Sequence, residues 1–388
     1  MTIKPHEVAT IVVQGLRFDD WESVFVQDRW ADPWPIFRFT ASERDPIPRL
    51  WERLQFKPDD ECAIYLGGRL AVAGVILKRQ TAYDAQNHGV MLEGVGITWY
   101  AATGSVVHKT GNFDEKTFSQ VAHEVIAPFG VGVKTIGALN ATPFKRLQVE
   151  PGETLWNFLE RIARPRGIVM GSDHQGNFLL IGDHAFAVTN SLIEGHNILR
   201  CQATISREAF YSDIIVRAAT AGSDDKHGRD ASEQEARIKG RAKRYRPLIT
   251  PAEQPVWGLP EVVDRARNEA VWQQGDEVRV TITVQGWFAP NGNLWRPGEL
   301  VAVYSPMAMI NMGLKIQNVT FTQDSNSGTL TTLDLVAPWL LKDHGDYNVG
   351  KPGAPQAPGE ARPDSTPPAT PQSGRVRDPH PETLTSSA

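Results

Sequence analysis

The most constraining feature of the sequence is a pair of glycines, Gly67 and Gly68, between short apolar runs at residues 62–66 and 70–72. A two-residue hairpin turn needs positive φ at both central positions, which glycine adopts without strain. The pattern therefore predicts a β-hairpin. Further short runs between turn residues lie at 11–13, 24–26, 36–40, 74–79 and 90–97. Strands of this number and spacing predict a small barrel or sandwich over residues 1–102.

The next segment, residues 103–198, has helical periodicity. Asp114 is a candidate cap for a helix whose apolar positions recur at i, i+3, i+4 and i+7, namely Phe118, Val121, Ala122 and Val125. A second helix is predicted from Thr154 to Pro165 by the same spacing. Runs at 167–170 and 177–181 flank polar turn residues and predict a β-hairpin. This segment is expected to form a small α+β domain.

Residues 199–342 return to strand-like patterns and predict a second β domain. Strand candidates lie at 201–206, 213–218, 277–284, 300–304, 314–322 and 328–336, with a helix predicted at 260–274. The charged stretch 222–246 has almost no large apolar residue and is interpreted as an exposed loop or insertion. Residues 343–388 are rich in Pro, Gly, Ser and Thr, so they predict a disordered tail. The predicted class is β-rich α+β and multidomain.

Composition excludes several classes of function. The formal net charge of -5 argues against a dedicated nucleic-acid binder, which usually carries a strong basic excess. The start of the chain lacks the pattern of a signal peptide, and no stretch approaches the roughly 20 apolar residues that span a bilayer. Cys62 and Cys201 each lie in an apolar run without metal-ligand spacing, so no disulfide or zinc site is expected. The sequence therefore predicts assembly in a reducing cytoplasm.

No catalytic motif stands out. The GxSxG elbow, the Walker loop, the GxGxxG cradle and the HExxH zinc pattern are absent from the sequence. Two Asp-His pairs, at 173–174 and 183–184, have the residue types of acid–base catalysis, but turns and strand ends commonly carry such residues. No catalytic, cofactor-binding or metal-binding residue is predicted, and the chain is expected not to be an enzyme.

The segment at residues 152–167 (GETLWNFLERIARPRG) is the most distinctive. Its opening resembles a LysM peptidoglycan-binding repeat. A LysM module would continue into a second helix, whereas here Pro165 and Gly167 lead directly into the predicted hairpin. Cell-wall binding therefore stays open as an alternative.

Three stretches together resemble the hub proteins of Mu-like contractile phages, a family related to the T-even baseplate hub and to the N-terminal half of type VI secretion spikes. They are GLRFDDWESVFV at 15–26 with the FRF run at 37–39, the helix-plus-hairpin segment at 152–182, and Gly286-Trp287 followed by the segments at 292–306 and 317–338. The order and spacing of these stretches carry the resemblance. Neither the Pro-rich tail nor the charged stretch at 222–246 is explained by it.

The resemblance implies a trimer in which each subunit contributes two similar β-barrel domains. Three chains would then form a ring that adapts the sixfold tail tube to the threefold central spike. The implied partners are two further copies, the central spike, the tail tube, the tape-measure protein and other baseplate proteins. The ring would leave a channel for DNA and the tape-measure protein in the virion, without specific nucleic-acid binding and without a membrane span.

Tryptophan is abundant, with 11 residues in the chain. Trp30, Trp34 and Trp51 cluster near turns and prolines, where they are candidate anchors for a neighbouring subunit. Local packing under loops is the alternative explanation for each of them. Two other functions also remain open, the hub part of a secretion or injection spike and a peptidoglycan-binding or peptidoglycan-degrading tail protein.

Overall fold

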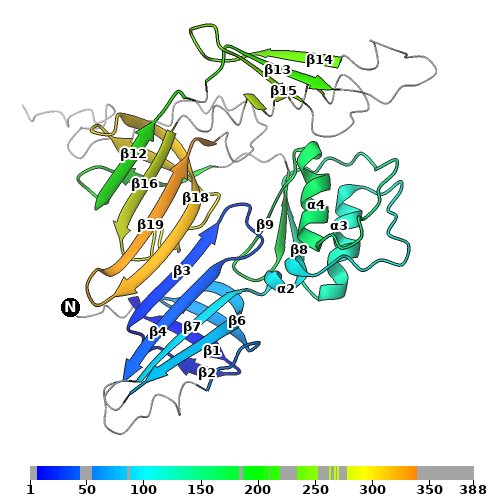
Figure 1. The fold of residues 1–388 in the computed structure, drawn as a ribbon. Coiled ribbons are helices and arrows are strands. Elements are labelled where there is room, and N and C mark those ends of the chain that lie inside the picture. The colour runs from blue at the N-terminus through cyan, green and yellow to red at the C-terminus, as the bar shows by residue number, and fades with distance from the viewer. Residues whose placement is uncertain are drawn as a thin grey trace, which may run out of the picture. The chain divides into compact units, whose positions relative to one another are not determined.

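The computed structural model describes residues 7–43, 55–84, 88–182, 187–208, 210–218, 234–251, 262–263, 266–267, 269–270 and 278–338 (Figure 1). Trp51, Asp183, His184 and the predicted tail at 343–388 lie outside these residues. Most of the predicted helix at 260–274 lies outside them too, and the described parts of it are helical.

The described part of the first region consists of strands up to Gly96, and a helix at Thr98–Thr103 begins before the predicted boundary at residue 102. Its strands are β1 (Ala9–Val13), β2 (Leu16–Phe18), β3 (Ser23–Arg29), β4 (Ile36–Glu43), β5 (Glu61–Leu66), β6 (Arg69–Tyr83) and β7 (His88–Gly96). The hairpin of β5 and β6 is confirmed, with φ of 55° at Gly67 and 79° at Gly68. The runs predicted at 70–72 and 74–79 are parts of one 15-residue strand, β6. A bulge between Ile76 and Lys78 lets this strand bend while both halves stay paired.

The second region combines helices with a small sheet. It contains α2 (Thr98–Thr103), α3 (Phe118–Ile126), η2 (Ala127–Phe129), β8 (Val133–Ile136), α4 (Leu155–Ala163), η3 (Arg164–Arg166), β9 (Val169–Ser172) and β10 (Phe178–Ile181). Both helices bury the predicted apolar faces. The prediction of Asp114 as a cap is wrong. Thr117 caps α3 through the backbone N of Gln120, whereas the Asp114 carboxylate accepts a hydrogen bond from the backbone N of Leu147 at 2.9 Å.

The third region supplies β11 (Val188–Ile193), β12 (Arg200–Ile205), β16 (Val278–Gln285), β17 (Leu300–Ser305), β18 (Ile310–Asp324) and β19 (Gly328–Val336). A separate three-stranded sheet contains β13 (Asp213–Ala218), β14 (Gln234–Lys239) and β15 (Pro247–Pro251). The loop prediction is therefore wrong for 234–239, where β14 pairs with β13 and buries Ala236 against Val216 and Val262. The alternating pattern of β14 is short and dominated by charged residues, which hid it in the sequence.

The large sheet contains a repeated strand order. One half has the strand order β12-β16-β19-β18-β17-β11. The other half has the order β3-β4-β7-β6-β5-β1. Chain order matches as well, because β12, β16, β17, β18 and β19 correspond to β3, β4, β5, β6 and β7. The three consecutive strands have the same lengths in both halves, 6, 15 and 9 residues. One difference is that β11 pairs parallel with β17, whereas β1 pairs antiparallel with β5.

A short corner before β5 and β17 repeats in sequence and in hydrogen bonding. FKPDD at 56–60 corresponds to WRPGE at 295–299. The backbone N of Asp59 donates to the carbonyl of Ile76 at 2.7 Å, and the N of Ile76 donates to Asp60 at 3.0 Å. In the other half, Gly298 donates to Ile316 at 2.8 Å, and Ile316 donates to Glu299 at 2.9 Å. The two halves are therefore built on one plan.

The halves are joined by antiparallel pairing of β3 with β18, which Figure 1 shows side by side. Their inward side chains belong to one apolar cluster that draws on both regions. Because the hydrogen-bonded ladder passes from one half to the other, the two separate barrel domains expected from the resemblance are not confirmed. A β-rich fold with a large, mainly antiparallel sheet is what the structure shows.

Candidate functional site: the junction between the two halves

The junction is closed by strand pairing and by one aromatic contact. β3 and β18 pair from Ser23 opposite Asp324 to Arg29 opposite Asn318. On the side chains, the Gln27 amide donates to the Thr320 hydroxyl at 3.2 Å. Cross-strand pairs of this kind stabilise a sheet and fix its register.

Trp30 follows β3 and packs within its own chain. Its backbone N donates to the carbonyl of Gln317 at 2.8 Å, and the Lys315 ammonium lies 4.3 Å from the centre of its ring. Gly298 has a φ of +83°, and a Cβ on it would lie 1.9 Å from the Trp30 ring. Only glycine allows this approach, so the half-buried Trp30 links the β3–β4 turn to the corner before β17.

Trp34 is also half-buried and packs against the apolar cluster of the α+β domain. The remaining candidate anchor, Trp51, lies outside the described residues. For Trp30 and Trp34 the described contacts favour the local-packing alternative. A role in contacting a neighbouring subunit stays a prediction for all three.

Arg296 connects the corner before β17 to the start of β6. Its guanidinium donates to the carbonyl of Leu70 at 2.6 Å and to that of Ala71 at 3.2 Å. Burial raises the pKa of Asp28, on the inward face of β3, to about 7, although the positive charge of Arg296 acts in the opposite direction. A buried carboxyl with this pKa gains a proton at mildly acidic pH, so the junction is sensitive to pH in that range.

The Asp173–His174 pair lies in the β9–β10 turn and serves packing. The Asp173 carboxylate accepts hydrogen bonds from the backbone N of Gln175 at 2.9 Å and of Asn177 at 2.8 Å. The carbonyl of His174 accepts from the backbone N of Ala73 in β6 at 2.9 Å. Burial lowers the pKa of the His174 imidazole to about 4, so it is neutral near pH 7. This pair docks the α+β domain onto the large sheet.

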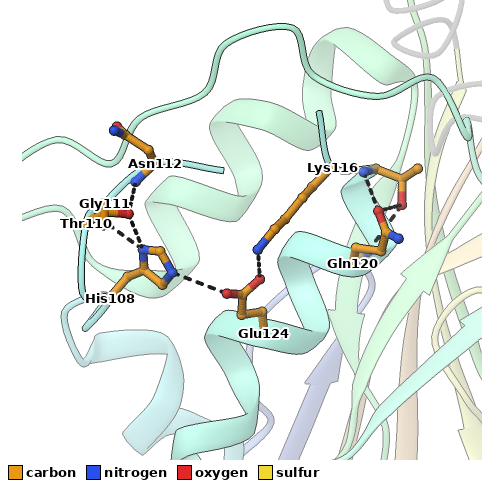
Figure 2. Close-up of polar contacts among 8 residues, drawn as sticks. His108, Thr110, Gly111, Asn112, Lys116, Gln120 and Glu124 are labelled. Carbon is orange, nitrogen blue, oxygen red and sulfur yellow. Dashed lines mark hydrogen bonds and ion pairs between the residues drawn. The ribbon is translucent and has the colours of Figure 1, made fainter. Parts of the chain in front are cut away.

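A polar cluster on the α+β domain was not anticipated from the sequence (Figure 2). The Nε2 of His108 lies 3.2 Å from a carboxylate oxygen of Glu124, and Lys116 lies 2.5 Å from the other oxygen. The hydrogen bond from Lys116 holds the pKa of Glu124 below its usual range. The Nδ1 of His108 accepts from the backbone N of Gly111 at 3.0 Å, which leaves it occupied as an acceptor. An imidazole whose Nδ1 already accepts this hydrogen bond is not free to take a proton from Thr110, so the cluster fastens residues 108–112 to α3.

Clusters of metal-ligating side chains and membrane-spanning helices are both absent from the described parts of the chain. No group of three or more His, Cys, Asp or Glu side chains in them is arranged to hold a metal ion. The helices in these parts are all too short to cross a bilayer.

Comparisons with known proteins match both the α+β region and the end of the large sheet. Residues 102–182 match the family described as "Baseplate hub protein gp44-like, second domain". Residues 261–342 match the family described as "Mu phage baseplate assembly protein GpP, fourth domain". Over 338 residues the chain is 24% identical to the baseplate hub protein gp44 of Escherichia phage Mu, covering 84% of this chain and 86% of that protein. The chain is thus similar to the baseplate hub proteins of Mu-like phages.

Solved structures of other proteins share the fold of this chain. The 43 kDa tail protein of prophage MuSo2 from Shewanella oneidensis aligns with a TM-score of 0.74 at 24% identity, covering 86% of this chain and 99% of that one. The E. coli c3393 protein, a component of the type VI secretion system, aligns with a TM-score of 0.52 at 10% identity, covering 84% and 76% of the two chains. The resemblance predicted from the sequence is therefore confirmed.

The repeated corner is the feature that sequence reasoning missed. An aromatic residue, a basic residue and proline at 56–58 recur at 295–297, each followed by an acidic residue two positions after the proline. This signal was available in the sequence. Because only four of the five positions match in residue type, the strand order was needed to give the match a meaning.

Proposed function

We propose that the chain is a structural subunit of the baseplate hub of a contractile phage tail and that it carries out no catalysis. Three copies would form a ring in which the two halves of each large sheet alternate as six near-equivalent barrel-like units. Such a ring presents sixfold positions to the tail tube and threefold positions to the central spike. Its channel would pass DNA and the tape-measure protein.

The observation that carries this proposal is the repeated strand order, with its repeated corner, within one chain. A subunit that contains the same design twice can occupy two successive positions of a ring, so three subunits supply six positions. The mildly acidic net charge of -5 suits a channel wall past which DNA moves without binding. The relatives among baseplate hub proteins support a place in the tail, assembled in the host cytoplasm.

Light scattering coupled to size-exclusion chromatography tests the assembly. We expect a particle of three chains, each of 42.9 kDa, alone or in the presence of the spike protein. Class averages from electron microscopy are expected to show a ring with six similar lobes. A chain that stays monomeric at all concentrations, with its spike partner present, would contradict the proposal.

The hub part of a secretion or injection spike is a second candidate, favoured by the shared fold of the type VI component. Genes for tube, sheath and tape-measure proteins beside this gene would favour the tail, whereas genes for a secretion ATPase would favour the spike. A peptidoglycan-binding or wall-degrading tail protein is the third candidate. Solubilised fragments after incubation with purified cell wall would favour it.

A further inference from the structure

We propose that each copy of this chain adds its strand β12 to the distal half of β6 in the next copy, as an antiparallel pair. This inference deepens the proposed trimer and rests on it. Its basis is that the structure contains a closed junction, β3 with β18, and two corresponding strand edges that have no strand neighbour among the described residues.

The two open edges are the counterparts of the two closed ones. β3 pairs with β4 on one side and β18 on the other, whereas its counterpart β12 pairs only with β16 among the described residues. The distal half of β18 pairs with β19 and β3, whereas residues 78–83 of β6 pair only with β7 within the described part of the chain. Each open edge therefore lacks the neighbour that the other could supply.

Apolar side chains are buried at the closed junction and exposed at the two open edges. In the closed junction Val24 and Val26 of β3 and Phe321 of β18 are buried. At the open edges Tyr83 is 81% exposed and Ile205 is 46% exposed. Apolar side chains at an open strand edge favour pairing with another chain.

The corresponding ladders define the register. Ile76 corresponds to Ile316, because both make the same hydrogen bonds to the repeated corner. The β6–β7 and β18–β19 ladders then shift register at the same point, directly after these two residues. Val24 corresponds to Cys201, because Val24 lies opposite Phe39 of β4 and Cys201 lies opposite Ile282 at the matching position of β16. Because Val24 lies opposite Gln323 in the closed junction, Cys201 is expected opposite Tyr83 in the open one.

This register brings complementary side chains together. Asp84 falls opposite Arg200, as Asp324 lies opposite Ser23 in the closed junction. Gln80 falls opposite Thr204, at the position where Thr320 lies opposite Gln27 in the closed junction. The glutamine and the threonine have changed strands, so the same hydrogen bond can form. Opposite charges and amide–hydroxyl pairs across strands both stabilise pairing.

Lys57, in the corner before β5, is placed to make the contact between copies that Arg296 makes within one chain. Lys57 corresponds to Arg296, which donates to the carbonyls of Leu70 and Ala71 at the start of β6. Lys57 is exposed in the single chain, whereas its counterpart is half-buried. In the ring, Lys57 would reach the start of β18 in the next copy, near Ile310.

A disulfide between copies tests the register. In the full chain, Tyr83→Cys is expected to form a bond under mild oxidation with the native Cys201 of the neighbouring copy, because directly opposed residues have Cα atoms about 4.5–5.5 Å apart. Ala82→Cys is the matched control, since its side chain lies on the opposite face of β6. Covalent dimers and trimers on a non-reducing gel are expected for Tyr83→Cys alone and should vanish when Cys201→Ser is added.

The assembly state of the unmodified chain separates the two proposals. If the chain is trimeric but Tyr83→Cys forms no more cross-links than Ala82→Cys, the strand pairing is wrong and the trimer stands. If the chain is monomeric under all conditions, the hub proposal fails and the pairing fails with it.

A charge exchange gives a second readout that needs no oxidation. Arg200→Glu is expected to weaken the trimer, so that the chain concentration needed for assembly rises about tenfold. The reason is that Asp84 and the new glutamate would then face each other. Asp84→Lys combined with Arg200→Glu should restore assembly. Equal weakening by the single and the double variant would contradict the proposed register.

Discussion

The two halves of the large sheet share strand order and strand lengths but differ in what covers their edges. In one half β3 is enclosed between β4 and β18, and its inward residues are buried. In the other half β12 pairs with a single strand of the described part of the chain, and four of its six residues are exposed. The same design is thus complete at one junction and incomplete at the other. A comparison of matched positions therefore separates what stabilises the chain from what would join chains together.

The largest expected difference concerns Asp28, whose counterpart in β12 is Ile205. Burial raises the pKa of Asp28 from 3.8 to about 7, so between these values the folded state holds a proton that the unfolded state releases. Stability contributed by this group is present below about pH 4 and is lost as pH rises toward about 7. The shift of about three pKa units corresponds to a loss on the order of 4 kcal/mol.

Asp28→Asn should remove that loss, because the amide stays neutral. Chemical denaturation from pH 4 to pH 8 measures it as the difference between the variant and the unmodified chain, which cancels the other carboxyl groups. We expect the variant to gain stability relative to the unmodified chain as pH rises. A difference that does not change with pH would show that Asp28 is ionised in the fold.

The next effect concerns the repeated corner, where Gly298 in one half stands at the position of Asp59 in the other. Both have positive φ, but only Gly298 lies against a tryptophan ring. Gly298→Ala is expected to lower the free energy of unfolding by about 3 kcal/mol, since the added carbon clashes with Trp30 and the backbone conformation becomes strained.

Gly292→Ala serves as the control for that experiment. Gly292 has a φ of +80° with nothing near its would-be Cβ, so only the backbone strain of about 1 kcal/mol is expected. Urea denaturation of both variants measures the difference. Equal losses would mean that contact between Gly298 and Trp30 does not stabilise the junction.

The smallest effect compares Gln27 with Thr204, its counterpart in β12. Gln27→Ala removes the hydrogen bond to Thr320 and should lower the free energy of unfolding of the single chain by about 1 kcal/mol. Thr204→Ala should leave the unfolding of the single chain unchanged and weaken assembly instead. If Thr204→Ala destabilises the dissociated chain as much as Gln27→Ala, the two edges do not differ as described.

Local structure was predictable where one chemical pattern decides it. The glycine pair at 67–68, the periodic apolar positions of α3 and α4, and the turn at 172–176 each produced the predicted element. Predictions failed where the outcome depends on residues far along the chain. Asp114 had the composition of a helix cap, yet its carboxylate binds the backbone N of Leu147, 33 residues away.

The candidate site shows the same limit. Trp30, Trp34 and Trp51 were selected because they lie near turns, which says where they are in the chain but not what they contact. The partners of Trp30, namely Gly298 and Lys315, lie in the other half of the sheet. The buried state of Asp28 likewise depends on strands from both halves. Sequence spacing carries no information about such contacts.

By itself the sequence determined the β-rich class, the helices α3 and α4, the β9–β10 hairpin and the family resemblance, because hydrophobic periodicity and turn residues act over a few positions. Only the tertiary structure decided that β3 pairs with β18, that the two halves repeat one strand order, and that β12 and the distal half of β6 have one strand neighbour each among the described residues. Strand pairing depends on backbone groups that every residue carries, so side-chain identity specifies a strand far better than it specifies that strand's neighbours.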